Sequence, residues 1–205
     1  MAVRQPTKVV FDIGNVLLRW DPRNLYRKVF PDEEQREWFL REVCSMSWHA
    51  EQDRGRGGDE AMAELVQRHP EWETEIRAFY GRWEEMFAGI FEENVAVLER
   101  LRAAGVPTYA ITNYPAEQFR LGRERFPFLN GFEGIVVSGE ERLMKPDRAI
   151  FDLFFSRFGL EPADCVFIDD SLANIEAAQA LGMHTIHYAE PLDLAQELRR
   201  FGLPA

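Results

Sequence analysis

The stretch KVVFDIGNVLLRW, residues 8–20, decides the fold of this chain. It opens with the apolar residues Val9, Val10 and Phe11, then stops at Asp12, and Gly14 follows two positions later. A short apolar run of this kind predicts a strand buried on both faces, as in a parallel sheet. A carboxylate at the end of such a strand is the first candidate functional residue.

Four later apolar runs have the same character. With the first run, the predicted strands are Lys8–Asp12, Pro107–Thr112, Gly134–Ser138, Cys165–Asp169 and His184–Tyr188. Between the later runs, apolar residues at helical spacing before a glycine stop signal predict helices over Glu93–Ala104, Asp147–Phe158 and Leu172–Leu181. Strands that alternate with helices predict an α/β, doubly wound, five-stranded parallel (Rossmann-like) core.

One connection is much longer than the others. About 90 residues separate Gly14 from the next strand, far more than a single crossover helix requires. The segment reads as helical, with Asp32 and Asp59 as candidate helix caps, core aromatic residues, and a polar loop over Glu51–Glu60. We therefore expect an all-helical cap at 18–91, inserted into a core formed by 1–17 and 92–205.

Composition narrows the class of protein. The 205 residues carry 24 Lys and Arg against 35 Asp and Glu, a formal net charge of −11. That charge argues against a nucleic-acid partner, which needs a basic face. Two cysteines are too few for a disulfide framework, and no apolar run has the length of a membrane span. We expect a cytoplasmic protein with no membrane partner, present as a monomer or a homodimer.

Polar residues stand where the predicted strands end. Asp12 ends the first strand, Thr112–Asn113 the second and Asp169–Asp170 the fourth, and Lys145 follows the third. Ligands of a doubly wound sheet bind beyond these carboxyl ends. Crowded carboxylates need a cation, and oxygen ligands suit Mg²⁺. One carboxylate can attack phosphorus to give an aspartyl-phosphate, with Thr112 donating a hydrogen bond and Lys145 supplying positive charge.

Taken singly, each feature has a structural alternative. Asp12 suits a turn, Thr112–Asn113 a helix N-cap, Lys145 a solvated loop, and Asp169–Asp170 the start of a helix. Their order along the chain, each at a strand end, favours the joint functional interpretation.

The motifs FDIGN, ITN, MKP and FIDDSLANIEAA resemble the four ordered motifs of the haloacid dehalogenase (HAD) superfamily hydrolases. The insertion falls where that family carries its C1-type helical cap. The resemblance implies a Mg²⁺ cofactor and places roles on residues of this sequence. By this resemblance Asp12 is the nucleophile and a metal ligand. The other metal ligands are the Gly14 backbone carbonyl, Asp170 and, directly or indirectly, Asp169. The phosphate is bound by Thr112, Asn113 and Lys145, and Asn174 is a supporting residue.

Gly14 departs from the family pattern, because related phosphatases usually have an acid there that protonates the leaving group. We expect the rate to depend steeply on leaving-group quality as a result, and glycine at this position could hold a positive φ. The variant resembles alpha-D-glucose-1-phosphate phosphatases and, more distantly, the phosphatase domain of epoxide hydrolases. QDRG, residues 52–55, resembles that branch's substrate loop, which makes Arg54 a candidate substrate-binding residue, with an exposed loop arginine as the alternative.

The predicted function is Mg²⁺-dependent hydrolysis of a small phosphorylated metabolite, with a sugar phosphate as the expected substrate. Two alternatives stay open. A haloacid dehalogenase also lacks the second acid, although paired acids at Asp169–Asp170 would repel its carboxylate substrate. A non-catalytic regulatory or binding protein is the other, although binding alone requires neither Asp12 nor Lys145.

Overall fold

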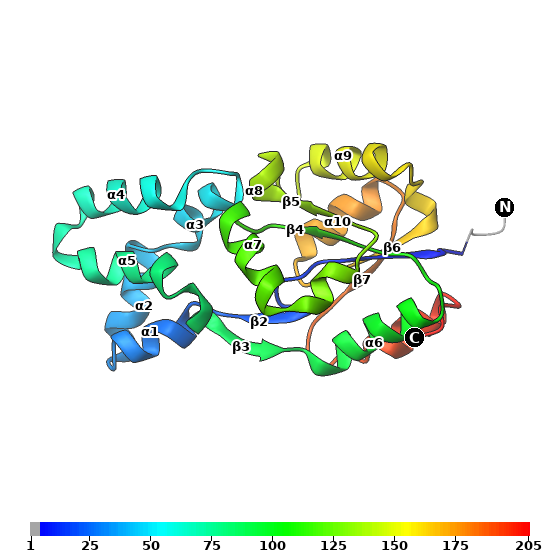
Figure 1. The fold of residues 1–205 in the computed structure, drawn as a ribbon, viewed down its shortest axis with the longest axis horizontal. Coiled ribbons are helices and arrows are strands. Elements are labelled where there is room, and N and C mark those ends of the chain that lie inside the picture. The colour runs from blue at the N-terminus through cyan, green and yellow to red at the C-terminus, as the bar shows by residue number, and fades with distance from the viewer. Residues whose placement is uncertain (1–4) are drawn as a thin grey trace.

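The computed structural model describes residues 5–205 and has a five-stranded parallel sheet at its centre (Figure 1). The strands are β1 (Lys8–Phe11), β4 (Thr108–Thr112), β5 (Gly134–Val137), β6 (Cys165–Asp169) and β7 (His184–His187). Their order is β5-β4-β1-β6-β7, so that β1 lies between β4 and β6. Each predicted strand is confirmed to within one residue at either end.

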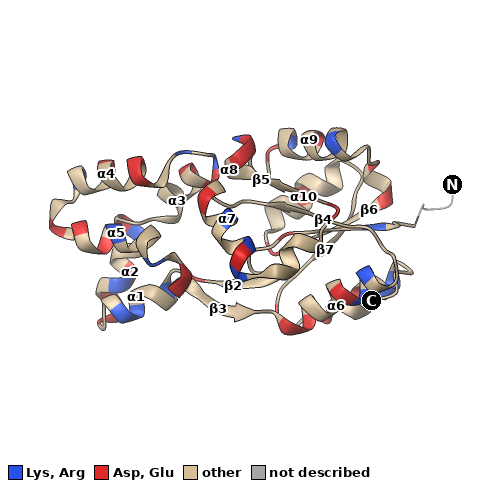
Figure 2. Ribbon diagram, in the orientation of Figure 1, with Lys and Arg blue, Asp and Glu red and all other residues tan. Residues whose placement is uncertain are grey.

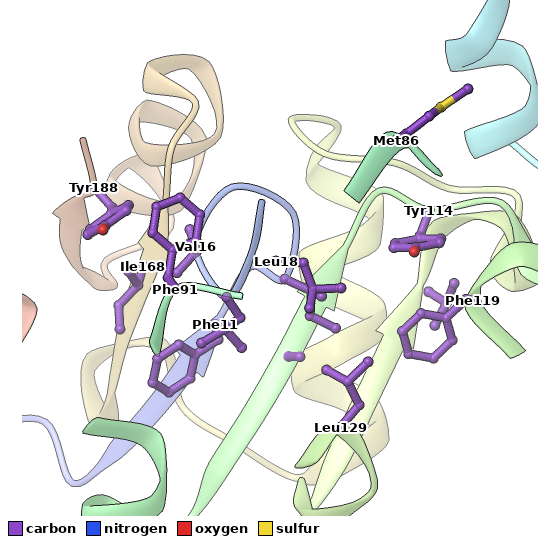
Figure 3. Close-up of a cluster of buried hydrophobic side chains, with 14 of the residues drawn as sticks. Phe11, Val16, Leu18, Met86, Phe91, Tyr114, Phe119, Leu129, Ile168 and Tyr188 are labelled. Carbon is purple, nitrogen blue, oxygen red and sulfur yellow. The ribbon is translucent and has the colours of Figure 1, made fainter. Parts of the chain in front are cut away.

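Helices cover both faces of this sheet. They are α6 (Glu92–Ala103), α7 (Ala116–Arg125), α8 (Ser138–Glu141), α9 (Arg148–Phe158), α10 (Leu172–Ala180) and α11 (Leu194–Arg200), with 3₁₀ turns at Pro127–Gly131 and Pro162–Asp164. Side chains alternate along β1, with Val9 and Phe11 in one hydrophobic cluster and Val10 in the other. Figure 3 shows Phe11 beside Ile168, its register partner on β6. Two covered faces explain why the strands are continuous apolar runs.

The long connection leaves the sheet through a pair of antiparallel strands. β2 (Leu18–Trp20) pairs with β3 (Phe87–Ile90), and we call this pair the stem. Between them lie α1 (Arg23–Val29), α2 (Glu33–Glu42), α3 (Met46–Asp53), α4 (Gly58–Arg68) and α5 (Glu73–Gly81), with 3₁₀ turns at Pro70–Trp72 and Trp83–Met86. These five helices, called the cap below, gather at one end of the molecule (Figure 1).

The helix ends inside the cap differ in part from those expected. Asp32 caps α2 as predicted, since its side chain accepts a hydrogen bond from the backbone N–H of Gln35. Asp59 does not cap α4, because Gly57 is the N-cap and Asp59 lies in the first turn. The loop predicted over Glu51–Glu60 is also wrong in extent, since α3 runs to Asp53. The polar residues at the start of this segment belong to α3, and one of them, Gln52, lies on the buried face of the helix.

Charged residues of both signs are interspersed over the helices in the view of Figure 2. Within residues 5–205, no helix has both the length and the apolar character needed to cross a membrane. Cys44 and Cys165 are buried free thiols.

Candidate active site

The carboxyl ends of the central strands bring three predicted residues together. Asp12 follows β1, Thr112 ends β4 and Asp169 ends β6. Because β1 pairs with both β4 and β6, these residues meet at one edge of the sheet. Lys145 reaches the same point from the loop before α9, as the order of the motifs predicts.

Lys145 is the centre of the arrangement. Its Nζ lies 2.9 Å from Oδ1 of Asp12 and 2.7 Å from Oδ2 of Asp169, and its side chain is fully buried. Burial opposes the charge on this ammonium, but the two carboxylates outweigh it and raise the pKa of Lys145. The lysine is therefore a fixed positive charge at neutral pH.

Asn113 holds the backbone of Lys145 in place. Its Nδ2 donates to the Lys145 carbonyl at 3.0 Å, and its Oδ1 accepts from the Lys145 N–H at 2.9 Å. With both ends of the amide engaged, Asn113 positions the lysine loop, a contact that the sequence did not predict.

Three carboxylates converge on one point. Asp12, Asp169 and Asp170 each offer an oxygen, and these oxygens all lie within 4.8 Å of one another. Burial, with repulsion from Asp169 and Asp170, raises the pKa of Asp12, and the charge of Lys145 opposes that rise. A divalent cation among these oxygens would remove the repulsion, so the donor set fits Mg²⁺.

Asp169 differs from the other two because both of its oxygens are already engaged. Oδ1 accepts from the N–H of Ser171 at 2.8 Å and from Nδ2 of Asn174 at 2.9 Å, and Oδ2 accepts from Lys145. Asn174 thus supports Asp169. This geometry leaves Asp12 and Asp170 with more free lone pairs for a cation.

Thr112 carries a buried hydroxyl whose bonding capacity is unused. Its side chain has no exposed surface, and its Oγ1 finds no hydrogen-bond partner in the described part of the chain. A buried polar group without a partner costs free energy, so such groups are frequently completed by a ligand. A phosphoryl oxygen would complete this one.

Gly14 leaves space beside Asp12. A Cβ built on Gly14 meets no atom of residues 5–205 within 4 Å, and Gly14 is not among the glycines with positive φ. The positive φ expected there is instead found at the next residue, Asn15, with a φ of 52°. A side chain at position 14 is therefore sterically possible.

A cavity of about 330 Å³ opens above these groups and is called the central cavity here. Its core side includes Asp12, Gly14, Asn15, Lys145, Asp170 and Asn174. Its opposite side comes from the stem, the cap and the turn that joins them, through Trp20, Met46, His49, Asp53, Trp83 and Phe87. A wider groove of about 1120 Å³ adjoins it and shares Asn15, Trp20, Met46 and Asp170.

The cap contributes Asp53 rather than the expected Arg54. Arg54 is about half exposed, pairs with Asp147 at 3.0 Å and does not line the central cavity. Asp53 lines the cavity and is 8% exposed. The i, i+4 spacing of His49 and Asp53 in the sequence could have indicated Asp53, because it places both residues on one face of a short helix.

The amino-acid sequence resembles one protein family and two named phosphatases. The family model for haloacid dehalogenase-like hydrolases matches residues 8–182. Sesquiterpene phosphatase astK of Aspergillus oryzae is 35% identical over 105 residues, 51% of this chain and 54% of astK. Phosphoglycolate phosphatase of Escherichia coli is 27% identical over 124 residues, 58% of this chain and 49% of that enzyme. This chain thus spans about half the length of both relatives.

A solved structure shares the fold over almost the whole length of this chain. A HAD family enzyme of Bacteroides thetaiotaomicron, in complex with magnesium and inorganic phosphate, has a TM-score of 0.72 at 22% identity. The match covers 95% of this chain and 100% of that one. At this identity the likeness concerns the fold alone.

Proposed function

The chain belongs to the haloacid dehalogenase-like hydrolases, and from that premise we propose that it is a Mg²⁺-dependent phosphomonoester hydrolase with Asp12 as its nucleophile. The observation that carries the proposal is the buried Lys145, whose Nζ contacts both Asp12 and Asp169 beside a third carboxylate. With a divalent cation bound by these carboxylates, such a site favours a ligand with several negatively charged oxygens. The names of the two curated relatives described above support a phosphoester substrate.

Each residue has a proposed part in the reaction. Asp12 attacks phosphorus and forms the aspartyl-phosphate, while Lys145 and the free hydroxyl of Thr112 bind the phosphoryl oxygens. Bound Mg²⁺, held by Asp12, Asp170 and the Gly14 carbonyl, would supply Lewis-acid stabilisation of the developing charge. Asp169 orients Lys145 through their short hydrogen bond.

The proposed substrate is a small phosphorylated metabolite, with a sugar phosphate as the first candidate. The central cavity holds about 330 Å³, which suits a small leaving group, and its walls carry Trp20, Trp83 and Tyr114. Aromatic rings pack against the C–H faces of a sugar and equally against an apolar chain. We further propose that 18–91 forms a cap domain and that 1–17 and 92–205 form the core domain.

Hydrolysis of a carbon–halogen bond is the second candidate activity, since it needs no leaving-group acid at position 14. The three carboxylates argue against it, because a halocarboxylate would meet their charge at close range.

The test is a panel of assays on the purified chain after EDTA treatment, with and without added Mg²⁺. The substrates are 4-nitrophenyl phosphate, glucose 1-phosphate, phosphoglycolate, farnesyl phosphate and 2-chloropropionate. We expect phosphate release only with Mg²⁺ and no halide release. Halide release without metal would establish the dehalogenase, and no turnover of any substrate would point to a binding protein.

A further inference from the structure

The open space at Gly14 raises the question of which group protonates the leaving oxygen. The titratable side chains that line the central cavity are Asp12, His49, Asp53, Tyr114, Lys145 and Asp170. Asp12 is the proposed nucleophile, Asp170 a proposed metal ligand, and Lys145 is held by two carboxylates. Of the remaining three, burial raises the pKa of Tyr114 and lowers that of His49 to about 3. Neither of these two can exchange a proton readily near neutral pH.

Asp53 is the remaining group, and its local structure aims it at the cavity. It is the last residue of α3, and Gly55, with a φ of 94°, ends the helix against the core. A Cβ on Gly55 would lie 2.9 Å from the carbonyl oxygen of Gly139, so only glycine permits this close approach. The contact holds the end of α3, and with it Asp53, over the sheet edge.

The Asp53 carboxyl group has a free oxygen. Its Oδ1 is buried and forms no hydrogen bond with any residue that the structure describes. The nearest basic atom is Nε2 of His49, at 3.7 Å, beyond hydrogen-bonding distance. A buried, unpartnered carboxyl oxygen that lines a ligand cavity is in position for a substrate atom.

The neighbours of Asp53 favour its protonated form. The Tyr80 hydroxyl donates to Oε1 of Gln52 at 3.2 Å, so at 2.9 Å it accepts from Nδ1 of His49. In this arrangement Nε2 of His49 carries a lone pair toward Asp53, which suits a carboxylic acid better than a carboxylate. Burial raises the pKa of Asp53 to about 7, and Lys145 opposes that rise. Both protonation states are therefore accessible near neutral pH.

We propose that Asp53, carried by the cap, is the general acid and base of the reaction in place of a side chain at position 14. This assignment rests on the proposed phosphatase function. In the first step the Asp12 oxygen bonds to phosphorus, the bond from phosphorus to the leaving oxygen breaks, and the Asp53 proton passes to that oxygen. In the second step the Asp53 carboxylate takes a proton from water. The water oxygen bonds to phosphorus, the bond from phosphorus to the Asp12 oxygen breaks, and inorganic phosphate leaves with Asp12 restored as a carboxylate.

The assignment changes the expectation drawn from Gly14. Without any acid, the rate should fall steeply as the leaving group becomes more basic. With Asp53 as the acid, the wild-type enzyme should show a shallow dependence. The titratable groups facing Asp53 are His49 on α3, Tyr80 on α5, and Tyr114 and Lys145 of the core, none of which exchanges a proton readily near pH 7. The pKa of Asp12 is also raised to about 7, but Asp12 attacks both kinds of substrate alike, so the ratio of alkyl to aryl turnover reports Asp53.

The experiment compares kcat/KM of wild type, Asp53→Asn and the exposed cap control Asp59→Asn on an alkyl phosphate and on 4-nitrophenyl phosphate. Asp53→Asn should lower the alkyl value by about 10²- to 10⁴-fold and the aryl value by less than about tenfold. With the aryl substrate it should also show a burst of nitrophenol, since hydrolysis of the aspartyl-phosphate then lacks its base. Asp59→Asn should match wild type. Equal losses on both substrates, or no loss, would overturn the assignment.

Two further measurements keep the result independent of folding. In wild type, the ratio of alkyl to aryl turnover should fall about tenfold per pH unit above about pH 7, as Asp53 loses its proton. The double variant Gly14→Asp/Asp53→Asn should regain alkyl turnover, because position 14 has room for a side chain. A constant ratio would reject Asp53 while leaving the phosphatase intact. A wild type inactive on every phosphate would instead reject the proposed function.

Discussion

At the scale of single residues, the site is organised by one buried cation among acids. The charge of Lys145 partly neutralises the carboxylates of Asp12 and Asp169. Asn113 holds the Lys145 backbone and Asn174 holds the Asp169 carboxylate through hydrogen bonds. A carboxylate that is fixed by a neighbouring positive charge is oriented before the substrate arrives. The charge of Lys145 also opposes the rise in the pKa of Asp12 and so favours the ionised form that can act as a nucleophile.

Asp12→Asn tests the nucleophile. The amide cannot form an aspartyl-phosphate, so phosphatase turnover should fall on the order of 10⁴-fold or more. The melting temperature should stay at or above that of wild type, since Lys145 keeps Asp169 and one of three crowded carboxylates is gone. Activity and thermal unfolding are measured on the same preparation. A variant with substantial turnover would exclude Asp12 as the nucleophile.

Asp53→Asn has a consequence for stability that is separate from turnover. The Asp53 pKa is raised from 3.8 to about 7 by burial. Between these values the folded protein holds a proton that the unfolded chain has lost, so Asp53 lowers stability as pH rises from about 4 to about 7. The difference in unfolding free energy between Asp53→Asn and wild type should therefore shift in favour of the variant by about 2–4 kcal/mol from pH 4 to pH 8. Urea unfolding at both pH values measures this, and a pH-independent difference would contradict the raised pKa.

At the scale of elements, the sequence predicts the core better than the cap. Each core strand is a buried apolar run that ends in a polar residue, so local pattern is sufficient for its position. The stem pairs Leu18 with Ile90, residues far apart in the chain, and no local pattern reports that pairing. The polar sequence at the end of α3 predicts a loop, whereas the helix found there is stabilised by packing of its buried face against α5 and the core. Asp53 was missed for the same reason.

The α3–α4 loop is where Arg54 can be tested. Because Arg54 pairs with Asp147 and does not line the central cavity, we expect Arg54→Ala to change KM for a sugar phosphate and for 4-nitrophenyl phosphate by the same factor, about twofold or less. The exposed ion pair with Asp147 contributes about 0–1 kcal/mol, so stability should change little. Asp147→Ala is the matched control, because it breaks the pair and keeps the guanidinium. A rise in KM for the sugar phosphate in Arg54→Ala that Asp147→Ala does not reproduce would show that Arg54 contacts the sugar.

At the scale of the whole molecule, the site lies between two parts that carry different chemistry. The sheet edge supplies the proposed nucleophile, the lysine and the proposed oxygen ligands, while the cap and the stem supply the walls of the central cavity and Asp53. This division explains why motifs in the core predict the candidate site at the sheet edge from sequence alone. Groups that surround the leaving group depend on how the cap packs on the core.

Removal and return of Mg²⁺ is the test at this scale. Repulsion among the three carboxylates destabilises the folded state, and a bound cation would remove that repulsion. A cation that binds the folded state alone stabilises it, by about 2.7 kcal/mol at a concentration one hundred times its dissociation constant. Mg²⁺ should raise the melting temperature of wild type and restore turnover after EDTA treatment. The gain in stability should be larger at pH 8 than at pH 5, because Asp12 and Asp170 must both lose their protons for the metal to bind. Burial and repulsion from neighbouring carboxylates raise the pKa of each of these two groups, so more of the protons remain bound at pH 5.

Asp170→Asn is the variant that separates metal binding from general charge relief. It removes the exposed carboxylate of the three and keeps the Lys145 contacts with Asp12 and Asp169. The variant should fold, lose most of the Mg²⁺-dependent rise in melting temperature and need at least about tenfold more Mg²⁺ for half-maximal turnover. Asp59→Asn, which removes an exposed acid of the cap, should keep the wild-type response. Full turnover by EDTA-treated wild type would exclude the metal, and an unchanged Mg²⁺ response in Asp170→Asn would move the cation away from Asp170.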